Sequence, residues 1–273
     1  MESKKKKFLY SIFTVIIVLA IAFSILYSLY WSDLITIILS NEGLWIGAVA
    51  IISRVFILGI MSFVLFRKWL RQEAIYISDA YFLFGSFFGI LTCAKIYDLF
   101  FNLVFISGAF PSELILLLAK VRFFVIIVNL IPILYIGLDA ILIYINMNKN
   151  KEMNKKQFNK LRLRIMLGYV LVTTLVIILA PSVDFLNLVF PFVTILIYIA
   201  IAFMFLFMYK NKRLVQANGL IIGIAFICFL ISNLIRTILI NTDLSLGIFA
   251  ELIDIGVNLL IFIGFISKPK YAK

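Results

Sequence analysis

Stretches of apolar residues long enough to cross a lipid bilayer recur along this chain, and they constrain its fold more than any other feature. The stretch Phe8–Tyr30 contains no charged residue, and neither does Ile165–Ala180. A hydrocarbon core about 30 Å thick requires roughly 20 apolar residues of helix. Hydrophobic residues make up 64% of the 273 residues and charged residues 14%, whereas soluble domains are about half apolar and about a quarter charged. The sequence therefore predicts an all-α, polytopic integral membrane protein.

Hydropathy places the predicted transmembrane helices at about 8–30, 44–66, 75–106, 113–147, 163–180, 186–209, 214–240 and 246–267. These eight helices make residues 1–273 a single transmembrane domain, because the longest hydrophilic stretch, Asn146–Arg164, is too short to fold alone. The third and fourth spans exceed the bilayer thickness, so they tilt, kink or extend beyond it. Pro132 predicts a kink in the fourth span. Short connections predict antiparallel hairpins for spans two and three and for spans six and seven.

Basic residues alternate between the connections and predict the orientation. Of the 25 Lys and Arg residues, 20 lie in five segments: Lys4–Lys7, Arg67–Arg71, Lys149–Arg164, Lys210–Arg213 and Lys268–Lys273. The alternate connections 31–43, 107–112, 181–185 and 241–245 contain neither Lys nor Arg, and their acidic residues are Asp33, Glu42, Asp184 and Asp243. By the positive-inside rule, both termini are cytoplasmic and the protein lies in the cell membrane. Tyr27, Tyr30 and Trp31 end the first span, which favours an uncleaved anchor over a cleaved signal peptide.

Several functional classes are disfavoured by composition. The net charge of +12 comes from loops between spans, which suits anionic lipid headgroups and not nucleic acid. The chain has no histidine, which removes imidazole acid–base catalysis and His-based zinc sites. Cys93 and Cys228 lie in apolar runs and are expected to be buried thiols. No phosphate-cradling glycine loop or aspartate-rich metal motif occurs, so we expect no enzyme, no metal and no cofactor.

Ionisable residues inside the predicted spans are the first functional candidates, because each costs roughly 2.5–3.5 kcal/mol to insert. Five basic residues lie outside the loops: Arg54, Lys95, Lys120, Arg122 and Arg236. Their expected acidic counterparts are Asp98, Glu251 and Asp254. With a rise of about 1.5 Å per residue, all but Arg54 fall near the external side. Arg54 falls near the midplane, about 15 Å from either end of its span.

Helical spacing sorts these residues into polar stripes. Lys95, Asp98 and Asn102 share a helix face, as do Glu251, Asp254 and Asn258. One interpretation is an externally accessible pocket for a small polar or anionic ligand, bound by Arg54, Lys95, Asp98, Arg122, Arg236, Glu251 and Asp254. The other is a structural ion-pair network, with Lys95–Asp98 within one helix and Arg236–Glu251/Asp254 across the last hairpin.

Two weaker patterns concern helix contacts and duplication. Gly85-x-x-x-Gly89 and Gly219-x-x-x-Gly223 match the close-packing pattern of membrane helices, and they are expected to mark helix contacts and not a pore. Val128-Asn129-Leu130 and Val257-Asn258-Leu259 correspond in spans four and eight. That correspondence would fit two four-span halves in parallel.

Spans two to eight, residues 44–267, resemble the seven-helix membrane sensor region of histidine kinases and related signalling proteins. The matching stretches are Phe63–Phe101, Leu118–Tyr144 and Tyr209–Phe265. The middle stretch has the order Lys120-x-Arg122, an aromatic pair, and Asn129-x-x-Pro132. The resemblance implies seven spans that begin outside and end inside. Here a first span precedes them and no kinase or cyclase follows Ser267, so the resemblance implies a module that acts through a separate partner.

Two functional hypotheses follow. The first is an orphan multi-pass sensor or receptor-like module, whose polar pocket lies in the outer half of the bundle and which signals through a cytoplasmic or membrane partner. The alternative is a small secondary transporter, with Arg54 at the midplane as its substrate contact.

Overall fold

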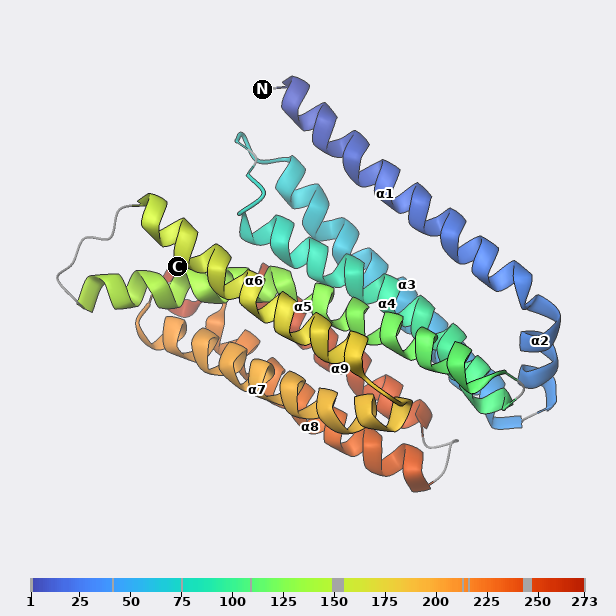
Figure 1. The fold of residues 1–273 in the computed structure, drawn as a ribbon. Helices are drawn as coiled ribbons and strands as arrows, with labels where there is room; N and C mark the ends of the chain where they lie inside the picture. The colour runs from blue at the N-terminus through green and yellow to red at the C-terminus, as the bar shows by residue number, and fades with distance from the viewer. Residues whose placement is uncertain are drawn as a thin grey trace. The chain divides into compact units, whose positions relative to one another are not determined.

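The computed structural model describes residues 2–40, 42–74, 76–108, 110–148, 155–212, 214–215, 217–242 and 247–272. These residues form helices and contain no strand (Figure 1). Eight of the described helices are long and apolar enough to cross a membrane, as predicted. The predicted connection residues Asp243, Arg213, Lys149 and Lys151 lie outside the described residues.

The chain divides into two compact units, Met1–Leu118 and Ala119–Lys273. The first contains α1 (Glu2–Leu29), α2 (Trp31–Ser40), α3 (Glu42–Leu70), α4 (Ala80–Ser107) and the start of α5 (Ser112–Asn148). The second contains the remainder of α5, with α6 (Lys155–Leu179), α7 (Val183–Lys210), α8 (Gly219–Thr242), α9 (Gly247–Ile266) and the short 3-10 helix η2 (Lys270–Ala272). The predicted single domain over 1–273 and the sensor-like core at 44–267 stay predictions.

Several helix boundaries differ from the predicted spans. The connection at 31–43 contains the apolar helix α2, whose ten residues are too few to cross a bilayer. Helix α6 begins at Lys155 and not at 163, because Lys, Gln and Arg continue a helix beyond its apolar part. Helices α4 and α8 begin at Ala80 and Gly219, and not at 75 and 214. Pro132 lies inside α5, which runs through it without interruption to Asn148.

In the first unit, α3 and α4 form the predicted hairpin and pack along their length (Figure 1). The Ser62 hydroxyl of α3 donates a hydrogen bond to the Gly85 carbonyl of α4 at 2.8 Å. The end of α1 and α2 pack against α4, where the Tyr27 and Tyr30 rings contact Phe100 at 5.6 and 5.7 Å. No residue of the α1 span Tyr10–Leu29 is buried, so this helix is held by its last turns.

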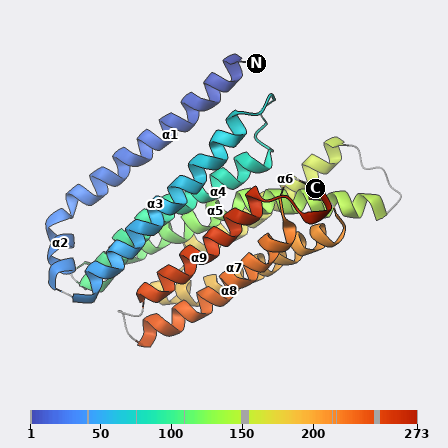
Figure 2. The ribbon, with the colours of Figure 1, turned by 180° about the vertical axis from the view of Figure 1, so that it is seen from behind.

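In the second unit, α8 packs between α7 and α9, which Figure 2 shows side by side. The predicted hairpin of spans six and seven is α7–α8. The Asn218 backbone amide donates a hydrogen bond to the Gly264 carbonyl at 2.8 Å, which connects the end of α9 to the start of α8. The Tyr271 hydroxyl adds a bond to the Leu214 carbonyl at 2.8 Å.

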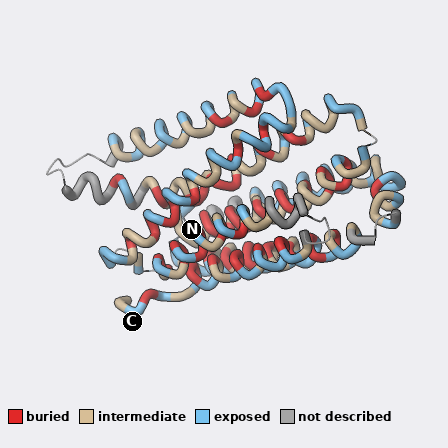
Figure 3. Tube along the Cα trace, turned by 90° about the horizontal axis from the view of Figure 1, so that it is seen from below, coloured by how far each residue is buried: buried red, intermediate tan, exposed pale blue. Residues whose placement is uncertain are grey.

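Large apolar side chains cover much of the outer surface. Phe56, Phe203 and Leu196 are each more than 65% exposed, and exposed positions alternate with buried ones along the helices (Figure 3). A contiguous apolar surface of this kind suits lipid and not water. The burial pattern therefore agrees with a multi-pass membrane protein whose helices contact lipid on their outer faces.

Candidate functional site

An ion-pair cluster joins α8 to α9. The Arg236 guanidinium of α8 donates from Nη2 to Glu251 Oε1 at 2.8 Å and also to Asp254 Oδ2, both carboxylates on α9. Glu251 and Asp254 are three residues apart, so the helix presents both carboxylates on one face. One planar guanidinium thus holds two carboxylates of the neighbouring helix.

Two further polar side chains, those of Ser232 and Asn258, hydrogen-bond to Asp254. The Ser232 hydroxyl of α8 donates to Asp254 Oδ1, and Asn258 Nδ2 donates to the Asp254 backbone carbonyl at 2.7 Å. Ser232, Asp254 and Asn258 are almost fully buried. Asp254 therefore accepts bonds from two residues of α8, which fixes the register of the α8–α9 hairpin at this level.

The charged side chains of the cluster differ in exposure. The side chains of Glu251 and Asp254 are 7% and 3% exposed, whereas that of Arg236 is 21% exposed. The guanidinium is thus the most accessible charged group of the cluster. An anion that bonded the guanidinium would compete with the two carboxylates for its donors.

The first unit contains a different ionic arrangement. Lys95 Nζ lies 3.0 Å from Asp98 Oδ2, one turn further along the same helix α4. The neighbouring backbone is engaged by tyrosines: the Tyr27 hydroxyl donates to the Ile96 carbonyl at 2.7 Å, and the Tyr97 hydroxyl donates to the Leu118 carbonyl at 2.9 Å. This ion pair joins two residues of α4.

Arg54 lies deep within α3, with only 1% of its surface exposed. The rise of a helix puts it about 18 Å from Glu42 and about 24 Å from Leu70. The Arg54 side chain interacts with other protein groups. That Arg54 lies near the bilayer midplane stays a prediction.

The two basic residues of α5 differ in role. Lys120 Nζ donates to the Ile178 carbonyl at 2.9 Å, one of the last carbonyls of α6. A cation at a helix carboxyl terminus satisfies an open acceptor and opposes the helix dipole, so Lys120 acts as a C-terminal cap. Arg122 is half-buried and has protein contacts.

The ion pairs proposed as a structural network, Lys95–Asp98 and Arg236–Glu251/Asp254, are both present. That these two groups and Arg122 line one ligand pocket stays a prediction. Sequence reasoning missed Ser232, although it precedes Arg236 by one turn and therefore shares its face. It also missed the Tyr27 contact, which no periodicity within a single helix could reveal.

Comparisons with protein-family models, with curated proteins and with solved structures give no match.

Proposed function

We propose that this chain is a multi-pass membrane sensor or receptor-like module, in which the α8–α9 hairpin responds to an anionic ligand. The observation that carries the proposal is the Arg236 cluster. A single, partly exposed guanidinium holds two buried carboxylates of the neighbouring helix. Such a contact between two helices is the kind of element that can occupy two discrete arrangements.

The response would be a competition for Arg236. A ligand carboxylate or phosphate that bonded the guanidinium would displace Glu251 or Asp254, which would then need a proton or a new partner. Loss of these bonds would loosen the contact between α8 and α9. A ligand shifts such an equilibrium only by its difference in affinity for the two arrangements. The role requires no catalytic step.

The basic ends of the helices supply the second half of the proposal. By the positive-inside rule, the basic residues at Lys4–Lys7 and Lys268–Lys273 support a cytoplasmic location for both termini. Basic connections on that side would then receive the signalling partner. A change at the α8–α9 cluster would reach that surface through α8 and α9, since α7, α8 and α9 pack along one another.

Hydrogen exchange of α9 tests the sensor proposal. The full chain in lipid nanodiscs is compared with and without inorganic phosphate or acetate. We expect an anion to increase exchange in Gly247–Ile266 of the natural sequence and to have no further effect in Arg236→Gln. Arg67→Gln, which removes an exposed arginine of α3, is the control. An unchanged exchange in the natural sequence, or the same anion response in Arg236→Gln, would contradict the proposal.

The alternative, a small secondary transporter, is favoured by one observation: Arg54 is buried near the middle of α3. A transporter places its substrate contact near the bilayer midplane. Proteoliposome uptake of small organic anions, compared between the natural sequence and Arg54→Gln, tests it. Uptake that is lost in Arg54→Gln would support the transporter. Equal uptake by Arg54→Gln and the natural sequence would exclude Arg54 as the substrate contact.

A further inference from the structure

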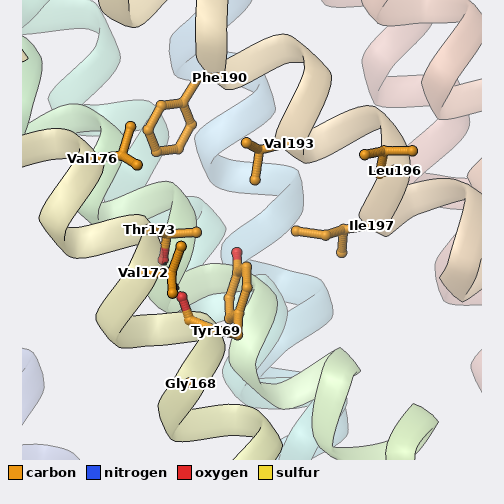
Figure 4. A pocket seen from close by; sticks show the side chains of 9 residues that line it. All are labelled: Gly168, Tyr169, Val172, Thr173, Val176, Phe190, Val193, Leu196 and Ile197. Atoms are coloured by element: carbon orange, nitrogen blue, oxygen red, sulfur yellow. Dashed lines mark hydrogen bonds between the residues drawn. The ribbon is translucent and has the colours of Figure 1, made fainter.

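The second unit has a groove of about 440 Å³ between α6 and α7, lined by residues within Gly168–Val176 and Phe190–Ile197 (Figure 4). Its walls are almost wholly apolar. The one threonine, Thr173, donates its hydroxyl to the Tyr169 carbonyl of its own helix at 2.7 Å. The Tyr169 ring points into the groove towards α7 (Figure 4). Binding sites for small molecules have volumes in this range.

Packing on α5 explains why the groove stays open. Lys120 of α5 caps the Ile178 carbonyl at one end of α6, and Arg162 near the other end lies 3.9 Å from the Tyr135 ring centre of α5. Phe190 of α7 packs on Phe123 of α5, with ring centres 4.3 Å apart. Both α6 and α7 are thus held by α5, which leaves the space between them unfilled on their outer side. Val172 and Leu196, at its rim, are 63% and 69% exposed.

One ridge of α6 connects this groove to positive charge. Lys160, Arg164, Gly168, Val172 and Val176 follow one another at intervals of four residues and are therefore neighbours along the helix surface. The first two are exposed cations and the last three line the groove. Arg164 lies about 6 Å along the axis from Gly168, and the lined part of α6 covers about 12 Å. Half of a hydrocarbon core is about 15 Å thick.

We propose that this groove is a binding site for one anionic phospholipid. An acyl chain lies in the groove between α6 and α7, and the headgroup phosphate meets Arg164 and Lys160. Tyr169, at the boundary between the cationic and apolar parts of the ridge, is placed to donate its hydroxyl to a lipid ester oxygen. The ridge matches a phospholipid in order as well as in length: its two cations come first and its apolar residues follow, and Tyr169 adds a polar group beside Gly168, where the two parts meet.

Three features distinguish this site from general lipid contact. The groove is concave, whereas a lipid-facing helix is convex. The cations are positioned one and two turns from its end. One wall of the groove has a glycine, Gly168, where an added Cβ would have no neighbour within 4 Å, so the groove is open at this position.

That glycine makes a sharp test possible. Gly168→Leu fills the groove without a clash at Cβ, and leucine favours helix more than glycine does, so the fold should persist. Gly256→Leu is the matched control, because Gly256 is an exposed glycine of α9 that also has no neighbour within 4 Å of its Cβ. Arg164→Gln removes the headgroup contact, with Arg67→Gln as its control on α3.

The full chain is purified in mild detergent, mixed with equal amounts of phosphatidylglycerol and phosphatidylcholine, and examined by native mass spectrometry. The natural sequence should retain one phosphatidylglycerol in preference to phosphatidylcholine. Arg164→Gln should lower that preference roughly fivefold, the effect of about one basic residue at a lipid surface. Gly168→Leu should lose the bound lipid, and both controls should retain it.

Two results would overturn the proposal. One is equal retention of the two lipids, or equal loss in Gly168→Leu and Gly256→Leu, which would mean non-selective lipid contact. The other is a two-copy species that only Gly168→Leu removes while lipid retention is unchanged, which would assign the groove to a second copy of the chain. Neither result bears on the anion response of Arg236, so this site and the proposed sensor function fail separately.

Discussion

The α3–α4 hairpin and the α7–α8 hairpin both contain two glycines four residues apart, but the neighbouring helix lies closer to these glycines in the second hairpin than in the first. A Cβ added at Gly85 would lie 3.3 Å from the Phe66 ring, a side chain that can shift. A Cβ added at Gly219 would lie 2.6 Å from the Phe205 backbone oxygen, and at Gly223 it would lie 3.1 Å from the Ala202 oxygen. In the second hairpin the backbones themselves approach closely, and only glycine fits.

The ion pairs of the two units also differ in whether they connect neighbouring helices. Lys95 and Asp98 pair within α4, whereas Arg236 pairs with Glu251 and Asp254 across two helices. The Lys95–Asp98 ion pair joins two residues of one helix. An interhelical cluster fixes how two helices pack. The comparison teaches that α8 is held tightly on both sides, by backbone contact with α7 and by charge with α9.

Of the substitutions that test this comparison, removal of Arg236 should lower the stability of the protein most. Arg236→Gln leaves two buried carboxylates without their cation, and breaking such a cluster costs about 3–5 kcal/mol. We expect the thermal unfolding midpoint in detergent to fall strongly, with Arg67→Gln unchanged. An unfolding midpoint equal to that of the natural sequence would show that the cluster does not hold α8 to α9.

The glycine comparison predicts a smaller and asymmetric effect. Gly219→Ala forces a methyl group against the Phe205 carbonyl and should cost about 1–3 kcal/mol. Gly85→Ala meets only the Phe66 ring, and the gain in helix propensity offsets much of the contact, so a change below about 1 kcal/mol is expected. Equal losses of unfolding free energy in the two variants would remove the distinction between the hairpins.

Exchange of the α4 pair should have the smallest effect. Lys95→Asp with Asp98→Lys keeps opposite charges three residues apart on one helix. Either single substitution puts like charges together, so each should lower the free energy of unfolding more than the double substitution does. A double variant as unstable as Arg236→Gln would mean that the Lys95 pair also fixes tertiary packing.

Much of the fold was predictable because a bilayer imposes helices of a known length. The eight apolar helices, the α3–α4 and α7–α8 hairpins and the glycine contacts all follow from hydropathy and spacing. The helix α2 did not, because ten residues are too few for a span, and the polar start of α6 did not, because a helix outside the hydrocarbon need not be apolar. Hydropathy therefore locates the apolar part of a helix better than it locates the helix ends.

The candidate site was predictable in part. Spacing put Glu251 and Asp254 on one face and suggested Arg236 as their partner, because both helices belong to one hairpin with a fixed antiparallel register. Ser232 shares that face and could have been added by the same reasoning. The role of Lys120 as a cap on α6 could not, because it joins residues 58 positions apart in the chain.

The amino-acid sequence by itself determined that this protein is a bundle of membrane helices and which residues carry charge into it, because transfer from water to lipid depends on composition and length. Only the tertiary structure decided which of the possible charge pairs form with Ser232 and Asn258 around them, how closely the glycines approach and where a groove remains. Those properties depend on helix rotation and on side chains from distant segments, which neither periodicity nor hydropathy contains. The ridge from Lys160 to Val176 shows both levels: its spacing is readable in the sequence, whereas the groove beside it depends on how α6 and α7 lie in the tertiary structure.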